Sequence, residues 1–196
     1  MVVVAAGRAW SQEHTHAASG EQLGAVHFTT TCVPGVATQF NKGIALLHSF
    51  EFGAAISSFQ DVLKQDSTCA MAQWGIALSR WTNPMAPGAR PAAALENGRA
   101  AARAASQLAE HASARERAYI DAVNRLYLDY EHTSHRNRVN DYEQAMATVA
   151  STYPADTEAT IFHALALVAA APPNDKSYAN QRAAGTTLER LWAKWP

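Results

Sequence analysis

The chain has 196 residues, enough for one domain or for one elongated array of repeats. Hydrophobic residues make up 48% of it and charged residues 17%, a balance that supports a sizeable core and argues against a disordered chain. Sixteen Lys and Arg against seventeen Asp and Glu leave a formal net charge of −1 with no basic patch, so nucleic acid is not an expected partner. No apolar run approaches the ~20 residues that cross a bilayer, so membrane insertion is not expected either.

The first residues bear on where the protein works. MVVVAAGRAWSQ contains a short apolar run and then small residues around Ala6–Ala9, as the end of a secretory signal peptide does. It lacks a charged start, and an ordinary N-terminus has the same look. We therefore expect residues 1–27 to form a flexible leader. If it is the remnant of a signal, the protein is exported to the periplasm or beyond; otherwise it is cytoplasmic.

Two closely connected helices are expected first. In TQFNKGIALLHSF (38–50), Phe40, Ile44 and Leu47 recur at the spacing of one helical face. The next run, EFGAAISSFQDVLKQD (51–66), also gathers its apolar residues on one face after a short break. Two such helices joined tightly predict an antiparallel hairpin.

Six more helices follow by the same reasoning. Pro91 suits the first turn of a long alanine-rich helix, and Ser113 with Glu116 forms a capping-box pattern at the start of the next one. The expected ranges are 69–81, 91–111, 113–129, 137–153, 157–170 and 180–196. The sequence therefore predicts an all-α protein of eight helices in four hairpins.

An internal repeat connects these hairpins. The tetrapeptide GIAL occurs at 43–46 and again at 75–78, in the middle of the first helix of hairpins one and two, and HALALV (163–168) takes the matching place in hairpin four. The second helices also end alike, as FQDVLKQDS, MATVASTYP and LERLWAKWP. This pattern resembles the tetratricopeptide repeat, whose period is ~34 residues. The residues that fall at repeat positions in hairpin one are Gly43, Leu46, Ala55, Phe59 and Val62, with Ser67 in the place of proline.

The wider resemblance is to exported bacterial tetratricopeptide proteins of largely unknown function. It rests on TTTCVPGVATQFNKGIALLHSFEF, DSTCAMAQWGIALSRWTNP and EATIFHALALVAAAPPNDKSYANQRAAG, and with the helix ends covers most of 23–196. The chain departs from the family at Glu51, usually aromatic, and at Asp66-Ser67, usually Asp-Pro. The resemblance implies export and a right-handed stack of about four hairpins over 28–196. Because members are longer, it also implies an array truncated at its C-terminus.

The two cysteines lie at the same end of the first expected hairpin. Cys32 precedes its first helix by about four residues, and Cys69 follows its second helix by about three. Antiparallel helices bring these ends together, at a separation that a disulfide spans. We expect a Cys32–Cys69 disulfide, with two reduced thiols as the alternative.

A polar stripe along the first helices is the expected binding site. First helices of successive repeats stack side by side and line the concave groove of such arrays. Polar residues at matching positions of helices one and three would offer hydrogen bonds to a peptide or protein partner, with alanines leaving room between them. The expected groove residues are Asn41, His48, Gln73, Arg80 and Trp81. The alternative is that these groups only pair within the stack.

Histidine pairs suggest a rival function. His14 and His16, with His27 nearby, could hold copper, nickel or zinc weakly, and an exported metal-handling protein would use such a segment. His132 and His135 pose the same question in a segment that is expected to be a loop. Two histidines do not complete the coordination of a metal ion. The alternative is therefore that the leader and the loop are solvated segments that bind no metal.

The sequence contains no recognisable catalytic pattern. HExxH, GxSxG, a glycine-rich phosphate loop and CxxC are all missing, and neither cysteine has a histidine in a nucleophile arrangement. We therefore expect a binding or scaffold module that needs no cofactor, with the metal-handling protein as the alternative.

Overall fold

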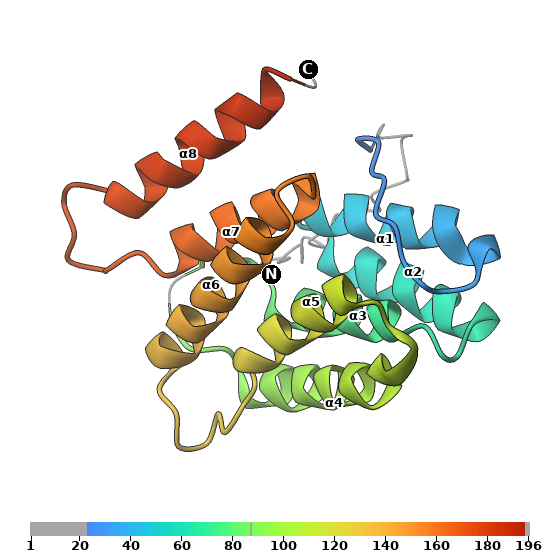
Figure 1. The fold of residues 1–196 in the computed structure, drawn as a ribbon. Helices are drawn as coiled ribbons and strands as arrows, with labels where there is room; N and C mark the ends of the chain where they lie inside the picture. Colours follow the sequence, from blue (N-terminus) through green and yellow to red (C-terminus); the bar gives the residue numbers. More distant parts are fainter. Residues whose placement is uncertain (1–22, 87, 195–196) are drawn as a thin grey trace, which may run out of the picture.

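The computed structural model describes residues 23–86 and 88–194, and within these ranges it contains helices and no strand (Figure 1). The expected all-α class is confirmed. The α-helices are α1 (Ala37–His48), α2 (Phe52–Gln65), α3 (Ala70–Trp81), α4 (Ala92–Leu108), α5 (Ala114–Arg125), α6 (His135–Thr152), α7 (Thr157–Ala169) and α8 (Ala179–Trp192). Two 3₁₀ turns, η1 (Pro34–Val36) and η2 (Ala109–His111), precede α1 and follow α4.

Most helix bounds lie within a few residues of the expected ones, and the largest differences are at the ends of α5 and of α8, which was expected to reach 196 but ends at Trp192. α5 was expected to reach Asp129 but ends at Arg125. The chain leaves the helix there because Leu126 and Tyr127 turn into the core, where the Tyr127 hydroxyl donates a 2.6 Å hydrogen bond to the carbonyl oxygen of Ala77. Asp129 then takes a left-handed conformation with φ of 45°, which Asp tolerates better than most residues.

Each α-helix packs against the next one along the chain, and first helices of neighbouring hairpins also touch. α1 contacts α3, and α3 contacts α5. α8 packs on α7 at one end of the molecule (Figure 1). None of the helices described is long and apolar enough to cross a membrane.

The repeated tetrapeptide has a packing explanation. The ring of Phe59, from α2, lies against Gly43 of α1 and Gly75 of α3, the first residues of the two GIAL copies. A Cβ atom added to Gly43 would stand 2.7 Å from this ring, and one added to Gly75 would stand 2.5 Å from it. Both distances are shorter than real Cβ atoms show. The glycine of each GIAL copy is therefore needed because it leaves room for the Phe59 ring, which both copies contact.

The chain also folds back on itself, because α7 contacts α1. His48 Nε2 lies 2.7 Å from Glu158 Oε2, and the His48 ring stacks on Phe162 with 5.1 Å between ring centres. The same Phe162 ring meets Trp74 of α3 edge-on at 5.5 Å. The first and fourth hairpins are thereby joined through their first helices.

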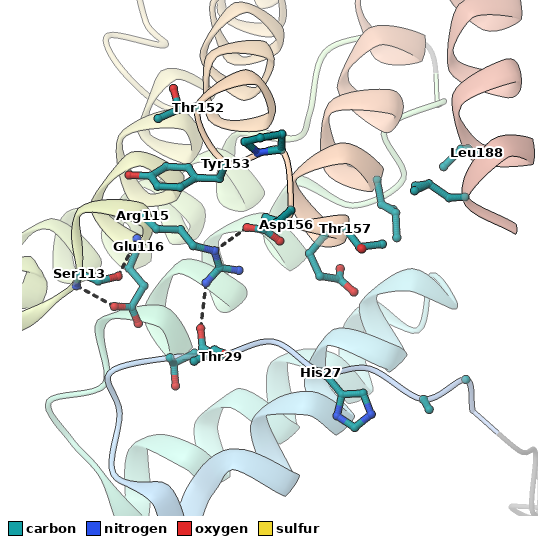
Figure 2. A pocket seen from close by; sticks show the side chains of 18 of the residues that line it. His27, Thr29, Ser113, Arg115, Glu116, Thr152, Tyr153, Asp156, Thr157 and Leu188 are labelled. Atoms are coloured by element: carbon teal, nitrogen blue, oxygen red, sulfur yellow. Dashed lines mark hydrogen bonds and ion pairs between the residues drawn. The ribbon is translucent and has the colours of Figure 1, made fainter. Parts of the chain in front are cut away.

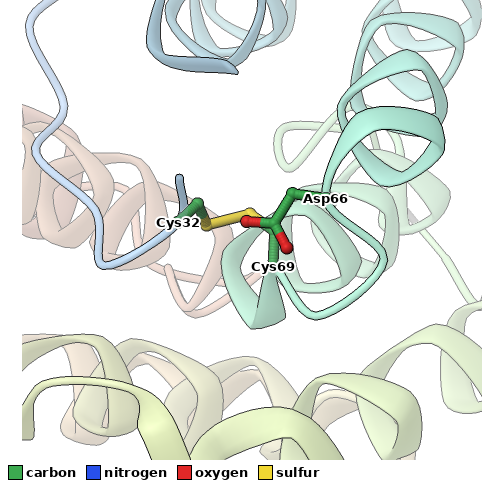
Figure 3. Close-up of side chains that lie close together, drawn as sticks. All are labelled: Cys32, Asp66 and Cys69. Atoms are coloured by element: carbon green, nitrogen blue, oxygen red, sulfur yellow. A yellow bond between two sulfur atoms is a disulfide. The ribbon is translucent and has the colours of Figure 1, made fainter. Parts of the chain in front are cut away.

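The expected disulfide is present. Cys32 and Cys69 are bonded, with 4.9 Å between their Cα atoms, and the Asp66 carboxylate lies beside them (Figure 3). One Asp66 oxygen accepts from the Val33 N–H, and the other accepts from both donors of Thr68. The bond fastens the segment before α1 to the start of α3.

Candidate functional site

Residues 23–33, which we call the strap, run in extended form across the first helices. Their main chain is held by side chains of α1 and α5. The hydrogen bonds from these helices are Phe28 N–H to Asn41 Oδ1 (2.9 Å), Arg115 Nη1 to the Thr29 carbonyl oxygen (2.9 Å), and Thr31 N–H to Glu116 Oε1 (2.7 Å), and the Val33 N–H donates to Asp66, after α2, at 2.9 Å. The helices thus bind a stretch of their own chain through that stretch's main chain.

Phe28 anchors the strap. Its side chain is 4% exposed and lies among three aromatic rings, those of Phe40, Trp74 and Tyr119, at 5.3 to 5.6 Å between centres. The Arg115 guanidinium covers the Phe28 ring at 4.4 Å from its centre, a cation–π arrangement. The anchor is therefore held from α1, α3 and α5 at once.

Asp156 fixes Arg115 in this position. It is the N-cap of α7, where it accepts from the Ala159 N–H at 3.2 Å, and it also accepts from Arg115 Nε at 2.5 Å and from the Tyr119 hydroxyl at 2.8 Å. Burial lowers the pKa of Arg115, but the Asp156 carboxylate outweighs it and raises the pKa above its usual value. Burial and Asp156 both raise the pKa of Tyr119, so its hydroxyl remains a donor.

Glu116 has two roles at the start of α5. It forms the expected capping box with Ser113, whose Oγ accepts the Glu116 N–H while Glu116 Oε2 accepts the Ser113 N–H at 2.8 Å. Its other oxygen accepts from both donors of Thr31 in the strap. The side chain is 1% exposed, so this cap also holds a segment distant in sequence.

A cleft of about 1820 Å³ opens above the strap (Figure 2). The strap forms its floor, and the start of α5 with the α6–α7 connection forms one side. The C-terminal half of α8 forms the opposite wall, where Leu188 is visible across the cleft from Arg115 (Figure 2). Four separate parts of the chain therefore meet around one open space.

The walls of the cleft combine apolar and acidic groups. Ile161 of α7 and Leu188 and Leu191 of α8 are half-buried, while Trp192 is 70% exposed. Glu189, also on α8, is exposed beside them. A large exposed aromatic side chain at a concave surface is typical of a contact site for a partner.

None of the five expected groove residues lines the cleft, but two of them, His48 and Trp81, line a second and smaller pocket between α1, α3, α6 and α7. Asn41 bonds to the strap and His48 pairs with Glu158, so both are engaged within the chain. Gln73 and Arg80 are half-buried on α3.

Trp81 lies in a separate cluster and is 3% exposed. The His135 ring stacks on it at 5.2 Å between centres, and the guanidinium groups of Arg90 and Arg138 lie 5.1 and 5.6 Å from the indole centre. Arg90 also donates to the carbonyl oxygens of Trp81 and Asn83. This cluster fixes the turn after α3 and does not face the cleft.

The histidines expected to hold a metal are placed as follows. His14 and His16 lie outside the described residues. His132 is exposed and pairs with Asp129 at 2.7 Å, whereas His135 stacks on Trp81, so the two have separate partners. His27 lines the cleft from the strap.

One set of three potential metal ligands lies close together in the part of the chain that the structure describes. Its members are Cys32, Asp66 and Cys69, within 4.8 Å of one another. Because the two sulfurs are bonded to each other, they are not available as thiolate ligands.

Several residues of the site were missed at the sequence level. Asp156 precedes an expected helix, and its N-cap position was a usable signal. Trp192 and Leu188 are four residues apart on α8, and the sequence analysis assigned this helix no binding role. For Arg115 no signal existed, because its partners in the strap lie 86 residues away.

Neither a family model, nor a curated protein, nor a solved structure matches this chain.

Proposed function

We propose that this chain is a tetratricopeptide-like binding module whose cleft holds an extended segment of a partner polypeptide. The strap is the observation that carries the proposal. The array already holds an extended segment by one buried aromatic anchor and by hydrogen bonds to the main chain. Peptide-binding surfaces use these same two devices, since main-chain bonds supply affinity and side-chain pockets supply specificity.

The neighbour relations of the helices support a right-handed stack of hairpins. First helices α1, α3 and α5 are in contact in series, as they are in arrays of helical repeats. In such arrays the first helices line the surface that partners use, and two of the first helices, α5 and α7, contribute residues to the cleft.

The size of the cleft favours a polypeptide over a small molecule. Small-molecule pockets usually span about 300–1,000 Å³ and enclose most of the ligand. A cleft of about 1820 Å³ that is open to solvent exceeds this range. Trp192 offers an exposed aromatic contact of the kind that dominates binding energies at interfaces.

A selection experiment tests the proposal. A library of random nonapeptides on beads is incubated with the full chain, with Trp192→Ala, and with Leu128→Ala as the matched control, since Leu128 is 63% exposed and does not line the cleft. We expect the full chain and Leu128→Ala to enrich the same sequences, and Trp192→Ala to bind them about tenfold more weakly. Equal binding by both variants, or no enrichment by the full chain, contradicts the proposal.

We also propose that the protein works in an oxidising compartment outside the cytoplasm. Disulfides persist in such compartments and are rare in the cytosol. Alkylating free thiols in intact cells before lysis, followed by mass mapping, tests this. The expected product is an unlabelled peptide pair joined through Cys32 and Cys69. Two fully labelled cysteines would contradict the proposed location.

A further inference from the structure

We infer that the cleft accepts a basic peptide in which lysine or arginine alternates with apolar residues. This inference rests on the proposed function and adds the chemistry of the ligand. Among the residues that the structure describes, four carboxylates line the cleft, those of Glu116, Asp156, Glu158 and Glu189, against one guanidinium, that of Arg115. With His27 neutral, four negative charges and one positive charge leave a formal charge of −3.

Two of these carboxylates are already committed to the fold. Asp156 is taken up by Arg115 and Tyr119, and Glu116 by donors of Thr31 and Ser113. These two carboxylates therefore affect a ligand only through the electrostatic potential inside the cleft. Glu116 accepts from neutral donors alone among the described residues, so its charge is not cancelled by a cation in direct contact.

The other two carboxylates are placed to meet a ligand. Glu158 has one oxygen on His48, and its side chain is 11% exposed at the start of α7. Glu189 is exposed on α8 and makes no ion pair within residues 23–86 and 88–194. The two stand on different walls of the same cleft, so a chain lying between them meets both.

Helix ends of both signs surround the cleft. The positive ends of α5 and α7 are covered by their own caps, Glu116 and Asp156. The last turn of α8 lies at the cleft, and a helix C-terminus carries a partial negative charge. Arg190 lies in the same turn and is exposed, so it offsets part of this charge, although it does not line the cleft.

The apolar residues of the cleft are the reason that we expect apolar residues to alternate with basic ones in the peptide. Side chains of an extended peptide point to opposite sides in turn. Leu188, Leu191 and Ile161 offer apolar surface on the walls that also carry Glu189 and Glu158. Trp192 adds an exposed ring on which a cation can rest. A peptide of alternating basic and apolar residues satisfies both kinds of surface at once.

Three fluorescein-labelled nonapeptides of the same length test the inference by anisotropy with the full chain. They alternate leucine with lysine, with glutamine or with glutamate. We expect the lysine peptide to bind about tenfold more tightly than the glutamine peptide, the glutamate peptide not to bind, and the difference to shrink when NaCl is raised from about 50 to about 500 mM.

Charge-removing variants locate the effect in the cleft. Glu189→Gln should weaken the lysine peptide about three- to fivefold without changing the circular dichroism spectrum, and Glu158→Gln should add to this loss. Glu110→Gln is the matched control, because Glu110 is exposed and does not line the cleft. Equal losses in Glu110→Gln and Glu189→Gln would overturn the inference.

The peptide series also separates the two proposals. Tight binding of the glutamate or glutamine peptide, lost in Trp192→Ala, overturns the basic ligand and leaves the peptide-binding module standing. Failure of all three peptides and of the random library overturns both.

Discussion

Phe59 presses its ring against two glycines, and neither position has room for a methyl group. In Gly75→Ala the new Cβ would lie 2.5 Å from the ring, which is fully buried and has no space to retreat. We expect the free energy of unfolding to fall by about 1–3 kcal/mol, the usual effect of overpacking. Urea denaturation followed by circular dichroism measures this.

Gly53→Ala is the control for the glycine experiment. Gly53 lies in α2, where an added Cβ meets nothing within 4 Å. Its replacement should leave stability unchanged or raise it by up to about 1 kcal/mol, because alanine favours the helix. A similar loss in both variants would mean that Phe59 does not set the requirement for glycine.

Asp66 should make stability depend on pH in acid. Burial raises its pKa, but hydrogen bonds from the Thr68 hydroxyl, the Val33 N–H and the Thr68 N–H together hold the pKa below its usual value. A lowered pKa in the folded state means that the carboxylate stabilises the fold above about pH 4 and that this is lost as pH falls through the folded value.

Asp66→Asn removes this titration. At pH 6 we expect the variant to be about 1–2 kcal/mol less stable than the parent chain, since a hydrogen-bonded charge is lost. Below pH 4 the difference should narrow. Urea midpoints of the two proteins between pH 2.5 and 6 measure it, and a difference that stays constant over this range would show that Asp66 is not the titrating group.

At the scale of elements, the strap depends on its anchor. Phe28→Ala removes a ring that is 4% exposed, and the loss in unfolding free energy should be about 3 kcal/mol. The amide proton of Thr31 should then exchange faster with solvent, because its bond to Glu116 relies on the strap staying in place. Val33→Ala, at a strap position that is 49% exposed, should change stability by less than about 0.5 kcal/mol.

Local elements were the part of the molecule that the sequence predicted best. The period of apolar residues located the first two helices, breaks at proline and loop residues bounded most of the others in the described part of the chain, and the Ser113–Glu116 spacing identified a cap that the structure contains. The cysteine pair was also predictable, because a single hairpin brings both cysteines to one end. The strap was not predictable, since its few residues carry no period and its contacts depend on where α5 lies.

At the scale of the whole molecule, Phe162 joins the fourth hairpin to the first two. Its ring contacts His48 of α1 and Trp74 of α3 and is 3% exposed. Phe162→Ala should lower the unfolding free energy by about 3–5 kcal/mol. Ile161→Ala, at a half-buried neighbour in the cleft, should have a smaller effect. Equal effects would argue that Phe162 packs only within its own hairpin.

The contact between α1 and α7 also shows that the apolar period of a helix does not predict which distant helix it will contact. His48 was expected to face a partner, but it faces Glu158, 110 residues later. Periodicity identifies which face of a helix is apolar, but it does not say which distant helix that face will meet. The cleft is lined by segments far apart in the sequence, so its lining residues could not be read from spacing alone.

The strap also imposes an order on the assembly of the chain as it is synthesised. Phe28 and Cys32 are made early, whereas Glu116, which holds Thr31, follows only after α4. At about 5–20 residues per second, several seconds separate the synthesis of Cys69 from that of Glu116. The Cys32–Cys69 bond keeps the strap beside α1 and α3 whether or not α5 has reached its place. A chain without this bond must bring together groups 85 residues apart with no earlier tether.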